Sequence, residues 1–304
     1  MERLLITLIL VCTMNNITNA QNPFYGQYHT PHEAVPFDRI ETEHYEPAIL
    51  EGIKLQNAEI EAIIQNPEKA DFTNTIEAFE ESGKLLDKVV AVFGNMLSAE
   101  TNDDLQELAQ KIMPLLSEHS NNITLNEKLF ARVKEVYNQK ETLQLTQEQK
   151  QLLENAYNSF VRHGANLEGE AREEYRRLTN ELSKLTLTFS ENNLKETNAY
   201  QMLLTKKESL AGLPEIIIEA AAETAKSEEK EGWAFTLHAP SYVPFMTYSD
   251  NRDLRQKLYM AYNTKCTHDN EFNNIDIVKN IANTRMKIAQ LLGYKDYAEY
   301  TLKK

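Results

Sequence analysis

Apolar residues recur three and four positions apart through most of the sequence after residue 42. Between residues 42 and 66, for example, the spacing is carried by Ile49, Ile53, Ile60 and Ile63. Comparable stripes run through residues 73–99, 101–116, 126–137, 146–164, 171–189 and 277–293. Because an α-helix turns once every 3.6 residues, this spacing places the apolar side chains on one face. The pattern therefore predicts a mostly α fold of helices packed as antiparallel hairpins.

Residues suited to capping divide the pattern into separate helices. We expect helix starts at Thr101, Asn126, Thr146 and Asp296, whose side-chain oxygens can accept a hydrogen bond from the first helical turn. Pro114 is expected to kink or end the helix that follows Thr101. Residues 73–99 are predicted to form a single helix that packs antiparallel to the helix of residues 42–66.

The stretch from residue 210 to 265 interrupts the helical pattern. A turn at Ala211–Pro214 precedes a helix-like run over residues 215–226 and a charged tip over residues 227–232. Trp233–Leu237 is rich in β-formers and is predicted to pair with Tyr200–Thr205. We therefore expect one small β-hairpin or sheet near residues 200–237.

A proline-containing aromatic cluster follows this predicted sheet. Tyr242, Phe245 and Tyr248 lead into a basic and apolar helix that ends near Lys265. Ser249 or Asp250 is the expected cap of that helix.

The first twenty residues have the features of a secretory signal peptide. Arg3 is followed by an apolar run over residues 4–11 and a polar segment that ends at Ala20, the predicted cleavage site. The run is too short to span a bilayer, and no later stretch is long enough. Cys12 suggests a lipoprotein alternative, which Val11 disfavours because cleavage before a lipidated cysteine requires a small residue. The product is therefore expected in the periplasm or secreted.

The predicted mature chain begins with an extended aromatic arm over residues 21–41, where three prolines oppose an α-helix. Removal of residues 1–20 would leave Cys266 as the only cysteine, so no intramolecular disulfide is expected. The formal net charge of the whole chain is −14, and no basic stripe with interleaved aromatic residues occurs. Nucleic acid is therefore not an expected partner.

The histidines do not have the spacing of a helical zinc site. Such a site needs two histidines four residues apart, with a glutamate directly after the first. The histidines of the chain are His29, His32, His44, His119, His163, His238 and His268. His32 and Glu33 are the nearest approach to the motif, but Pro36 stands where the second histidine would be needed. We therefore predict that this chain contributes no catalytic, cofactor-binding or metal-binding residue.

Three further groups contain residue types that can carry chemistry, and a structural role is favoured for each. Cys266 and His268 lie in a polar loop without an identifiable third group to orient them. Arg252 and Arg255 suit either carboxylate binding or ordinary surface ion pairs. The aromatic set is expected to fill a core rather than to line a peptide groove. Its members are Trp233, Phe235, Tyr242, Phe245 and Tyr248.

The order of several segments resembles a known family from about residue 22 to the last residue. The segments are Asn22-Pro23-Phe24, Phe37-Asp38-Arg39-Ile40, His44-Tyr45-Glu46-Pro47-Ala48, Phe72-Thr73-Asn74-Thr75-Ile76-Glu77, Ser98-Ala99-Glu100-Thr101-Asn102, Leu210-Ala211-Gly212-Leu213-Pro214 and residues 233–265. In this collinear order the chain closely resembles the bacterial peptidyl-dipeptidases of the thimet oligopeptidase and oligopeptidase A family.

This resemblance implies a zinc metallopeptidase that is much longer than this chain. In that family an amino-terminal helical half forms one wall of a channel that admits short, unfolded peptides. The carboxy-terminal half carries the His-Glu-x-x-His helix, in which a zinc-polarised water attacks the peptide bond. Residues 42–304 would then be the channel-wall region, truncated before the catalytic zinc domain. The complete enzyme would release dipeptides from peptide carboxyl ends, with zinc bound outside this chain.

Other functions remain open beside this one. The chain alone is expected to be inactive, because it lacks the zinc motif. As alternatives to the channel-wall region, the chain would be a non-catalytic peptide-binding module, or a stranded fragment that needs a separate catalytic half.

Overall fold

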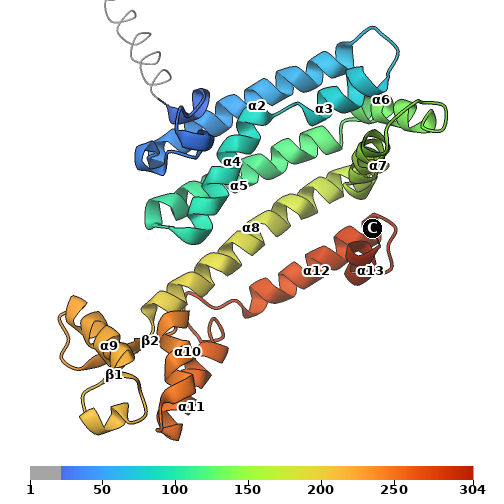
Figure 1. Cartoon of the computed structure of the whole chain (residues 1–304). Coiled ribbons are helices and arrows are strands. Elements are labelled where there is room, and N and C mark those ends of the chain that lie inside the picture. The colour runs from blue at the N-terminus through green and yellow to red at the C-terminus, as the bar shows by residue number, and fades with distance from the viewer. Residues whose placement is uncertain (1–21, 304) are drawn as a thin grey trace, which may run out of the picture. The chain divides into compact units, whose positions relative to one another are not determined.

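The computed structural model describes residues 22–303 and is mostly helical, as predicted (Figure 1). The predicted signal peptide and Cys12 lie outside the described residues. The chain divides into two compact units. Of the described residues, the first unit contains 22–183 together with 288–303, and the second contains Lys184–Lys287. Within residues 22–303, no helix is both long and apolar enough to cross a membrane.

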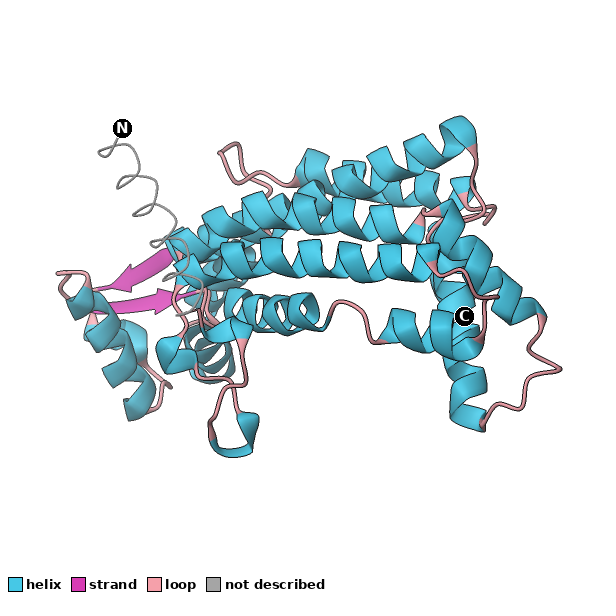
Figure 2. Cartoon of the chain, turned by 90° about the horizontal axis from the view of Figure 1, so that it is seen from above, coloured by secondary structure: helices cyan, strands magenta, loops and turns pink. Residues whose placement is uncertain are grey.

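The first unit is built from helices packed side by side (Figures 1 and 2). Its helices are α2 (Thr42–Gln65), α3 (Ala78–Glu80), α4 (Lys84–Ala99), α5 (Asp103–Thr124), α6 (Glu127–Asn138), α7 (Gln147–Arg162), the first half of α8 (Gly169–Ala199), the end of α12 (Ile275–Leu291) and α13 (Tyr297–Leu302). A large core is shared by α2, the turn before α3, α6 and α7, and it includes Ile76, Leu129, Val133 and Phe160.

Helices α2 and α4 pack closely because one of them offers a glycine at the contact. Gly52 of α2 is buried, and a Cβ atom built on it would lie 2.9 Å from the Cα of Leu86 in α4. The missing side chain lets the two backbones approach each other. The predicted packing of these two segments is therefore confirmed.

The prediction of one continuous helix over residues 73–99 was wrong. The segment contains a π-helical turn, η4 (Phe72–Glu77), then the short α3, a turn, and α4. The turn is closed by Gly83, which has a left-handed φ of +81°. Its backbone N–H donates a hydrogen bond to Oε2 of Glu59 at 2.8 Å. A glycine that adopts this conformation readily, with a carboxylate to satisfy its N–H, ends one helix and begins the next.

One helix start differs from the prediction, and one of the two alternatives for Pro114 is excluded. Asn102, not Thr101, caps α5, and its Oδ1 accepts a hydrogen bond from the N–H of Leu105 at 2.8 Å. Pro114 lies inside α5 without ending it.

Three of the predicted caps are confirmed. The side chain of Asn126 accepts from two backbone N–H groups of α6. Thr146 and Gln149 form a reciprocal capping box at the start of α7, and Asp296 caps α13.

The amino-terminal arm contains short turns in place of a fully extended chain. These are the single 3-10 turns η1 (Pro23–Tyr25), η2 (Pro31–Glu33) and η3 (Phe37–Arg39). Phe24 is fully buried, and its ring centroid lies 5.4 Å from that of Tyr45. Nδ2 of Asn22 donates to the backbone oxygen of His44 at 2.8 Å. The arm is therefore anchored to the helices by its first aromatic residue.

The carboxy-terminal residues of the chain belong to the first unit. Ile288 packs in a core with Leu125, Tyr175 and Leu178. The guanidinium of Arg162 in α7 donates to the backbone oxygens of Tyr300 at 2.7 Å and Lys303 at 2.5 Å. These carbonyls are among those that a helix end leaves unpaired, so Arg162 caps α13 from outside the helix.

The second unit carries the predicted sheet. Its elements are the second half of α8, β1 (Gln201–Leu204), the 3-10 turn η5 (Lys207–Leu210), α9 (Glu215–Ser227), β2 (Trp233–Thr236), α10 (Ala239–Tyr248), α11 (Arg252–Asn263) and the first part of α12. β1 and β2 are antiparallel, with Leu204 opposite Trp233 and Gln201 opposite Thr236 (Figure 2). The prediction of one small sheet near residues 200–237 is confirmed.

Helix α10 was not predicted as a helix, because prolines flank its aromatic residues. Pro240 occupies its first turn, where a missing N–H costs nothing, and Pro244 lies inside it. Phe245 of α10 is fully buried against Phe235 of β2, with ring centroids 4.6 Å apart. The cap of the following α11 is Asn251, not the predicted Ser249 or Asp250.

The close approach at Gly52 gives a prediction about stability. Gly52→Ala should destabilise the chain by about 1–3 kcal/mol, because the backbone at Leu86 must shift to admit the methyl group. Gly94→Ala in the partner helix α4 is the control, because nothing lies within 4 Å of a Cβ at that position. The control should be neutral or stabilising by up to about 1 kcal/mol. Urea unfolding followed by far-ultraviolet circular dichroism measures both, and equal effects would contradict the packing.

Candidate functional site

The histidines of the arm do not form a metal site. His29 and His32 both have left-handed φ values, of 52° and 58°, in the turns around Pro31. In the part of the chain that the structure describes, no three or more His, Cys, Asp or Glu residues group so as to hold a metal ion. The residues that the structure describes therefore do not fit the zinc that the family resemblance implies.

Arg255 and part of the aromatic set have structural roles. Nη1 of Arg255 donates to the backbone oxygen of Ser249, at the end of α10. Phe235 and Phe245 fill the core of the second unit, as predicted. Tyr248 is 52% exposed, so the aromatic set is divided between the core and the surface.

Cys266 and His268 are joined by a third residue that sequence reasoning missed. Glu196, near the end of α8, accepts a hydrogen bond from the backbone N–H of Cys266. The other oxygen of the same carboxylate lies 2.5 Å from Nδ1 of His268. Seventy positions separate Glu196 from Cys266, and no local sequence signal connects them. The long α8 brings the carboxylate to the loop that follows α11.

The electrostatics of this cluster oppose nucleophilic chemistry at the thiol. Burial, together with the neighbouring Glu196 carboxylate, raises the pKa of Cys266 to about 11. Burial also raises the pKa of Glu196, but hydrogen bonds from His268 and Cys266 outweigh it, so this pKa lies below its ordinary value. The thiolate is the reactive form of cysteine and is scarce at neutral pH here. The cluster therefore holds a loop in place, which agrees with the structural role predicted for Cys266.

A buried asparagine fixes the other end of the same loop. Asn274 is only 3% exposed, and its Nδ2 donates to the backbone oxygen of Phe189 at 3.0 Å. Its backbone N–H donates to the backbone oxygen of Cys266 at 2.8 Å, and its Oδ1 accepts from Asn192 at 2.9 Å. The loop of residues 266–274 is thus tied to α8 at both ends.

This loop forms one wall of a cavity of about 380 Å³. The other walls come from Phe189 of α8 and from Ile275 and Val278 of α12. These three side chains are 38%, 42% and 49% exposed. We call the cavity the apolar socket, with Cys266 in its wall and Lys265 among its lining residues.

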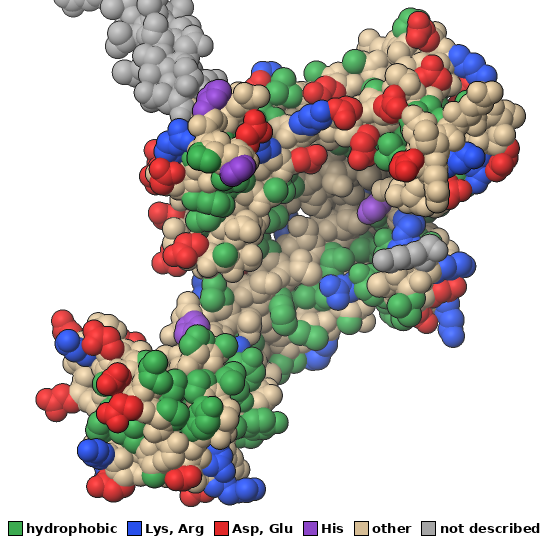
Figure 3. All heavy atoms as spheres, in the orientation of Figure 1, with side chains coloured by type: hydrophobic (Ala, Val, Ile, Leu, Met, Phe, Trp, Pro, Cys, Tyr) green, Lys and Arg blue, Asp and Glu red, His purple; other side chains and the backbone are tan. Residues whose placement is uncertain are grey.

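A tyrosine cluster, made of Tyr242, Tyr259 and Tyr262, lies next to the socket. The rings of Tyr242 and Tyr262 are stacked, with centroids 4.2 Å apart. Nζ of Lys265 sits 4.6 Å from the centroid of the Tyr262 ring, so Lys265 links the tyrosine cluster to the socket. Tyr259 and Tyr262 remain 49% and 39% exposed. Figure 3 shows hydrophobic side chains gathered over the region of α9, α10 and α11.

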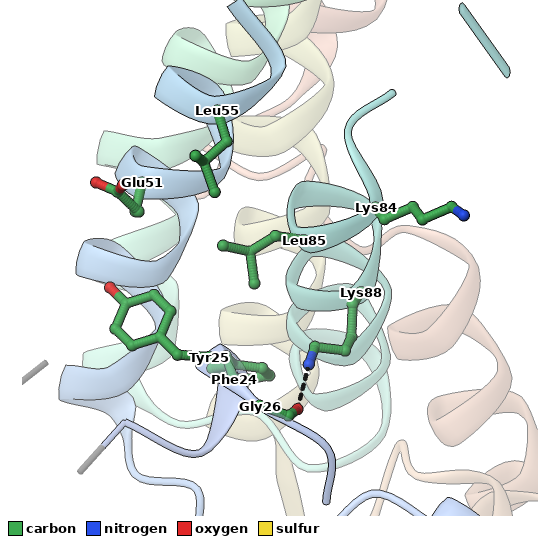
Figure 4. Close-up of a pocket in the computed structure, with 8 residues that line it drawn as sticks. All are labelled: Phe24, Tyr25, Gly26, Glu51, Leu55, Lys84, Leu85 and Lys88. Carbon is green, nitrogen blue, oxygen red and sulfur yellow. Dashed lines mark hydrogen bonds between the residues drawn. The ribbon is translucent and has the colours of Figure 1, made fainter. Parts of the chain in front are cut away.

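A larger cavity in the first unit has less to offer a ligand. It measures about 600 Å³ and lies between η1 of the arm and the helices α2 and α4 (Figure 4). The side chain of Lys84 points away from it, and Lys88 donates to the backbone oxygen of Gly26 at 3.0 Å. Its central residues, Leu55 and Leu85, face each other across the gap. The carboxylate of Glu51, another lining residue, accepts from Nζ of Lys54 at 2.9 Å.

The surface on the second unit is suited to recognition. It combines rigid aromatic rings, an apolar socket and a loop fixed by buried hydrogen bonds, but no activated nucleophile. Tyrosine rings and apolar pockets are typical of interaction surfaces, because they bury large area at small entropic cost. The exposed large apolar side chains of residues 22–303 are concentrated in this unit. They include Ile216, Val243, Tyr248, Tyr259, Met260, Tyr262, Ile275, Val278 and Met286.

Comparison with known proteins identifies peptidases as relatives. Residues 245–304, which contain α11, α12 and α13, match Peptidase family M3. The dipeptidyl carboxypeptidase of Escherichia coli K12 is 35% identical over 282 residues, 92% of this chain and 41% of that protein. Oligopeptidase A of Salmonella typhimurium is 30% identical over 285 residues, 92% of this chain and 41% of that protein. A probable cytosolic oligopeptidase A of Arabidopsis thaliana is 28% identical over 295 residues.

The helical fold and these matches together define the chain as a relative of peptidases. More particularly, it is similar over 92% of its length to a dipeptidyl carboxypeptidase and to an oligopeptidase A, and residues 245–304 match Peptidase family M3. The resemblance noted in the sequence is therefore confirmed. The chain spans about two fifths of the length of the curated relatives it matches, 41% for the first of them.

The Glu196 cluster predicts how stability depends on pH. Because the pKa of Glu196 is lowered on folding, its carboxylate stabilises the fold above the ordinary pKa of 4.5, and this is lost as the pH falls through the lowered value. Glu196→Gln should cost about 1–3 kcal/mol near neutral pH, with the difference from the wild type shrinking below about pH 4.5. Urea unfolding followed by the fluorescence of Trp233, in the same unit, measures it.

Glu223→Gln is the control, because Glu223 lies on α9 with its side chain 74% exposed and 3.8 Å from Lys226. It should change the stability little at any pH. A difference between Glu196→Gln and the wild type that stays constant down to pH 3 would contradict the role given to the carboxylate.

Proposed function

We propose that this chain is the channel-wall part of an exported zinc peptidase that releases dipeptides from short, unfolded peptides. One observation carries the proposal, namely the 35% identity to a dipeptidyl carboxypeptidase over 92% of the chain. The zinc and the catalytic residues would be supplied by the remaining polypeptide of such an enzyme. The chain alone would be catalytically silent, because the sequence contains no pair of histidines with His-Glu-x-x-His spacing.

In this proposal the chain contributes binding and exclusion. A rigid helical wall admits a flexible peptide and keeps a folded protein from the reacting centre. Rigid positioning of a substrate is itself a large part of catalysis. The helical packing of the first unit and the fixed loop of the second support such a role.

A peptide-binding module without a catalyst is the second candidate. The exposed tyrosine cluster favours it, since stacked aromatic rings are common in surfaces that bind peptides. Calorimetry of the purified chain with unstructured decapeptides separates the candidates. Stoichiometric binding to a stable monomer, without hydrolysis in the presence of any added partner, would favour the module.

The first test of the proposal is activity and metal content. The purified chain, incubated with zinc and then desalted, should retain only trace zinc and should not cleave peptides with a free carboxyl terminus. Elemental analysis and mass spectrometry of the peptides measure these two results. Stoichiometric zinc with hydrolysis that a chelator abolishes would overturn the claim that the chain is silent alone.

The second test concerns export. In a bacterial host the mature product should begin at Gln21 and be found in the periplasm or the medium. Ala20→Tyr should block processing, because signal peptidases need a small residue at the cleavage site, whereas Asn19→Tyr should be processed normally. Amino-terminal sequencing and intact mass report the outcome. A lipidated product beginning at Cys12, or retention of Met1 by the wild type, would refute this assignment.

A further inference from the structure

We propose that the apolar socket and the tyrosine cluster together form the surface on which the remaining polypeptide of a family M3 peptidase docks. This inference rests on the proposed function and deepens it by naming the partner and its site. The partner would insert an apolar side chain into the socket, against Phe189, Ile275 and Val278. An adjoining apolar segment would cover the rings of Tyr259 and Tyr262.

The first argument is that this surface is apolar and yet open. Val278 and Tyr259 are both 49% exposed, and Ile275 is 42% exposed. Soluble proteins rarely leave a contiguous apolar surface uncovered unless something binds there. Lys265 makes the surface continuous, because it both lines the socket and lies over the ring of Tyr262.

The second argument is that the surface is rigid before anything binds. The carboxylate of Glu196 holds the loop at Cys266, and Asn274 holds its other end to α8. Tyr242 supports the ring of Tyr262 from behind by stacking. A preorganised surface loses little conformational entropy on binding, which is the usual property of a site that anchors a partner.

The third argument identifies the occupant. The socket and the cluster are built largely from α11, α12 and the loop between them, all within the residues that match Peptidase family M3. The relatives are much longer, with the chain covering 41% of the Escherichia coli protein. The family segment that carries this surface therefore has, in its relatives, further polypeptide available to cover it.

A second copy of the chain is a poorer occupant on grounds of charge. The formal net charge is −14 for each chain, so two copies repel each other at low ionic strength. A short peptide could fill the socket, but it would leave the exposed apolar residues of α11 and α12 largely uncovered. The remaining polypeptide of relatives more than twice as long has the length to cover them.

The test measures binding in the absence of any reaction. The probe is the part of Escherichia coli dipeptidyl carboxypeptidase that the alignment with this chain leaves uncovered, produced as a separate polypeptide. Calorimetry and analytical ultracentrifugation should show a one-to-one complex with the full chain. Val278→Asp should weaken it by about tenfold or more, because a buried carboxylate would face an apolar partner.

Two variants keep this result interpretable. Ile216→Asp makes the same chemical change on α9 of the same unit, at a side chain that is 72% exposed, and should leave the affinity unchanged. Tyr262→Ser removes a ring of the cluster without adding a charge and should also weaken the complex. Circular dichroism and the thermal midpoint confirm that the probe and each variant are folded.

Several results would overturn the inference. These are no complex, a complex that Val278→Asp and Tyr262→Ser leave unchanged, or self-association of the chain that both variants abolish. Binding of unstructured decapeptides that is lost in both variants would instead assign the surface to substrate. If the complex forms as expected but does not hydrolyse peptides with zinc, the proposed function fails while the docking surface stands.

Discussion

The surface on the second unit depends on one buried carboxylate. Glu196 accepts from the N–H of Cys266 and pairs with His268, and in doing so it fixes the wall of the apolar socket. A carboxylate taken out of water is costly unless its oxygens are paired, so this arrangement is stable only while the loop stays in place. The same interaction withdraws Cys266 from thiol chemistry by raising its pKa. The Glu196 carboxylate thus fixes the wall of the apolar socket and also keeps the Cys266 thiol out of reaction.

The two units differ in what they expose. In the first, helices bury their apolar stripes against one another, and the close contact at Gly52 is one result. In the second, α11 buries Leu258 in the core, while aromatic and aliphatic side chains of α11 and α12, among them Tyr259 and Val278, lie at the surface. In the docking proposal, the additional polypeptide of relatives more than twice as long would cover this surface.

Much of the fold could be predicted because helical spacing and capping residues act locally. Asn126, Thr146 and Asp296 begin their helices as their side chains indicate. The break at Gly83 and the passage of α5 through Pro114 were missed or left open, because both depend on packing. Gly83 needs a carboxylate from another helix to satisfy its N–H, and spacing along the sequence does not reveal such a partner.

The candidate site was less predictable for the same reason. Sequence reasoning noted Cys266 and His268, and the aromatic residues Tyr242 and Tyr248, but it gave no way to find Glu196. The length and direction of α8 place Glu196 beside the loop at Cys266, and this placement is a property of the tertiary structure. The structural role predicted for Cys266 agrees with a thiol that is buried and has a raised pKa.

The contacts of Arg162 have a consequence for how the chain is made. Its hydrogen bonds to the backbone at Tyr300 and Lys303 join residues 138 and 141 positions apart. A ribosome adds about 5–20 residues per second, so residues 288–304 emerge roughly 5–25 seconds after Ser183. During that interval the first unit lacks a piece of its core at Leu125, Tyr175 and Leu178. The nascent chain therefore passes through a stage in which that apolar surface is exposed to solvent. A chaperone would have an apolar surface to bind at that stage.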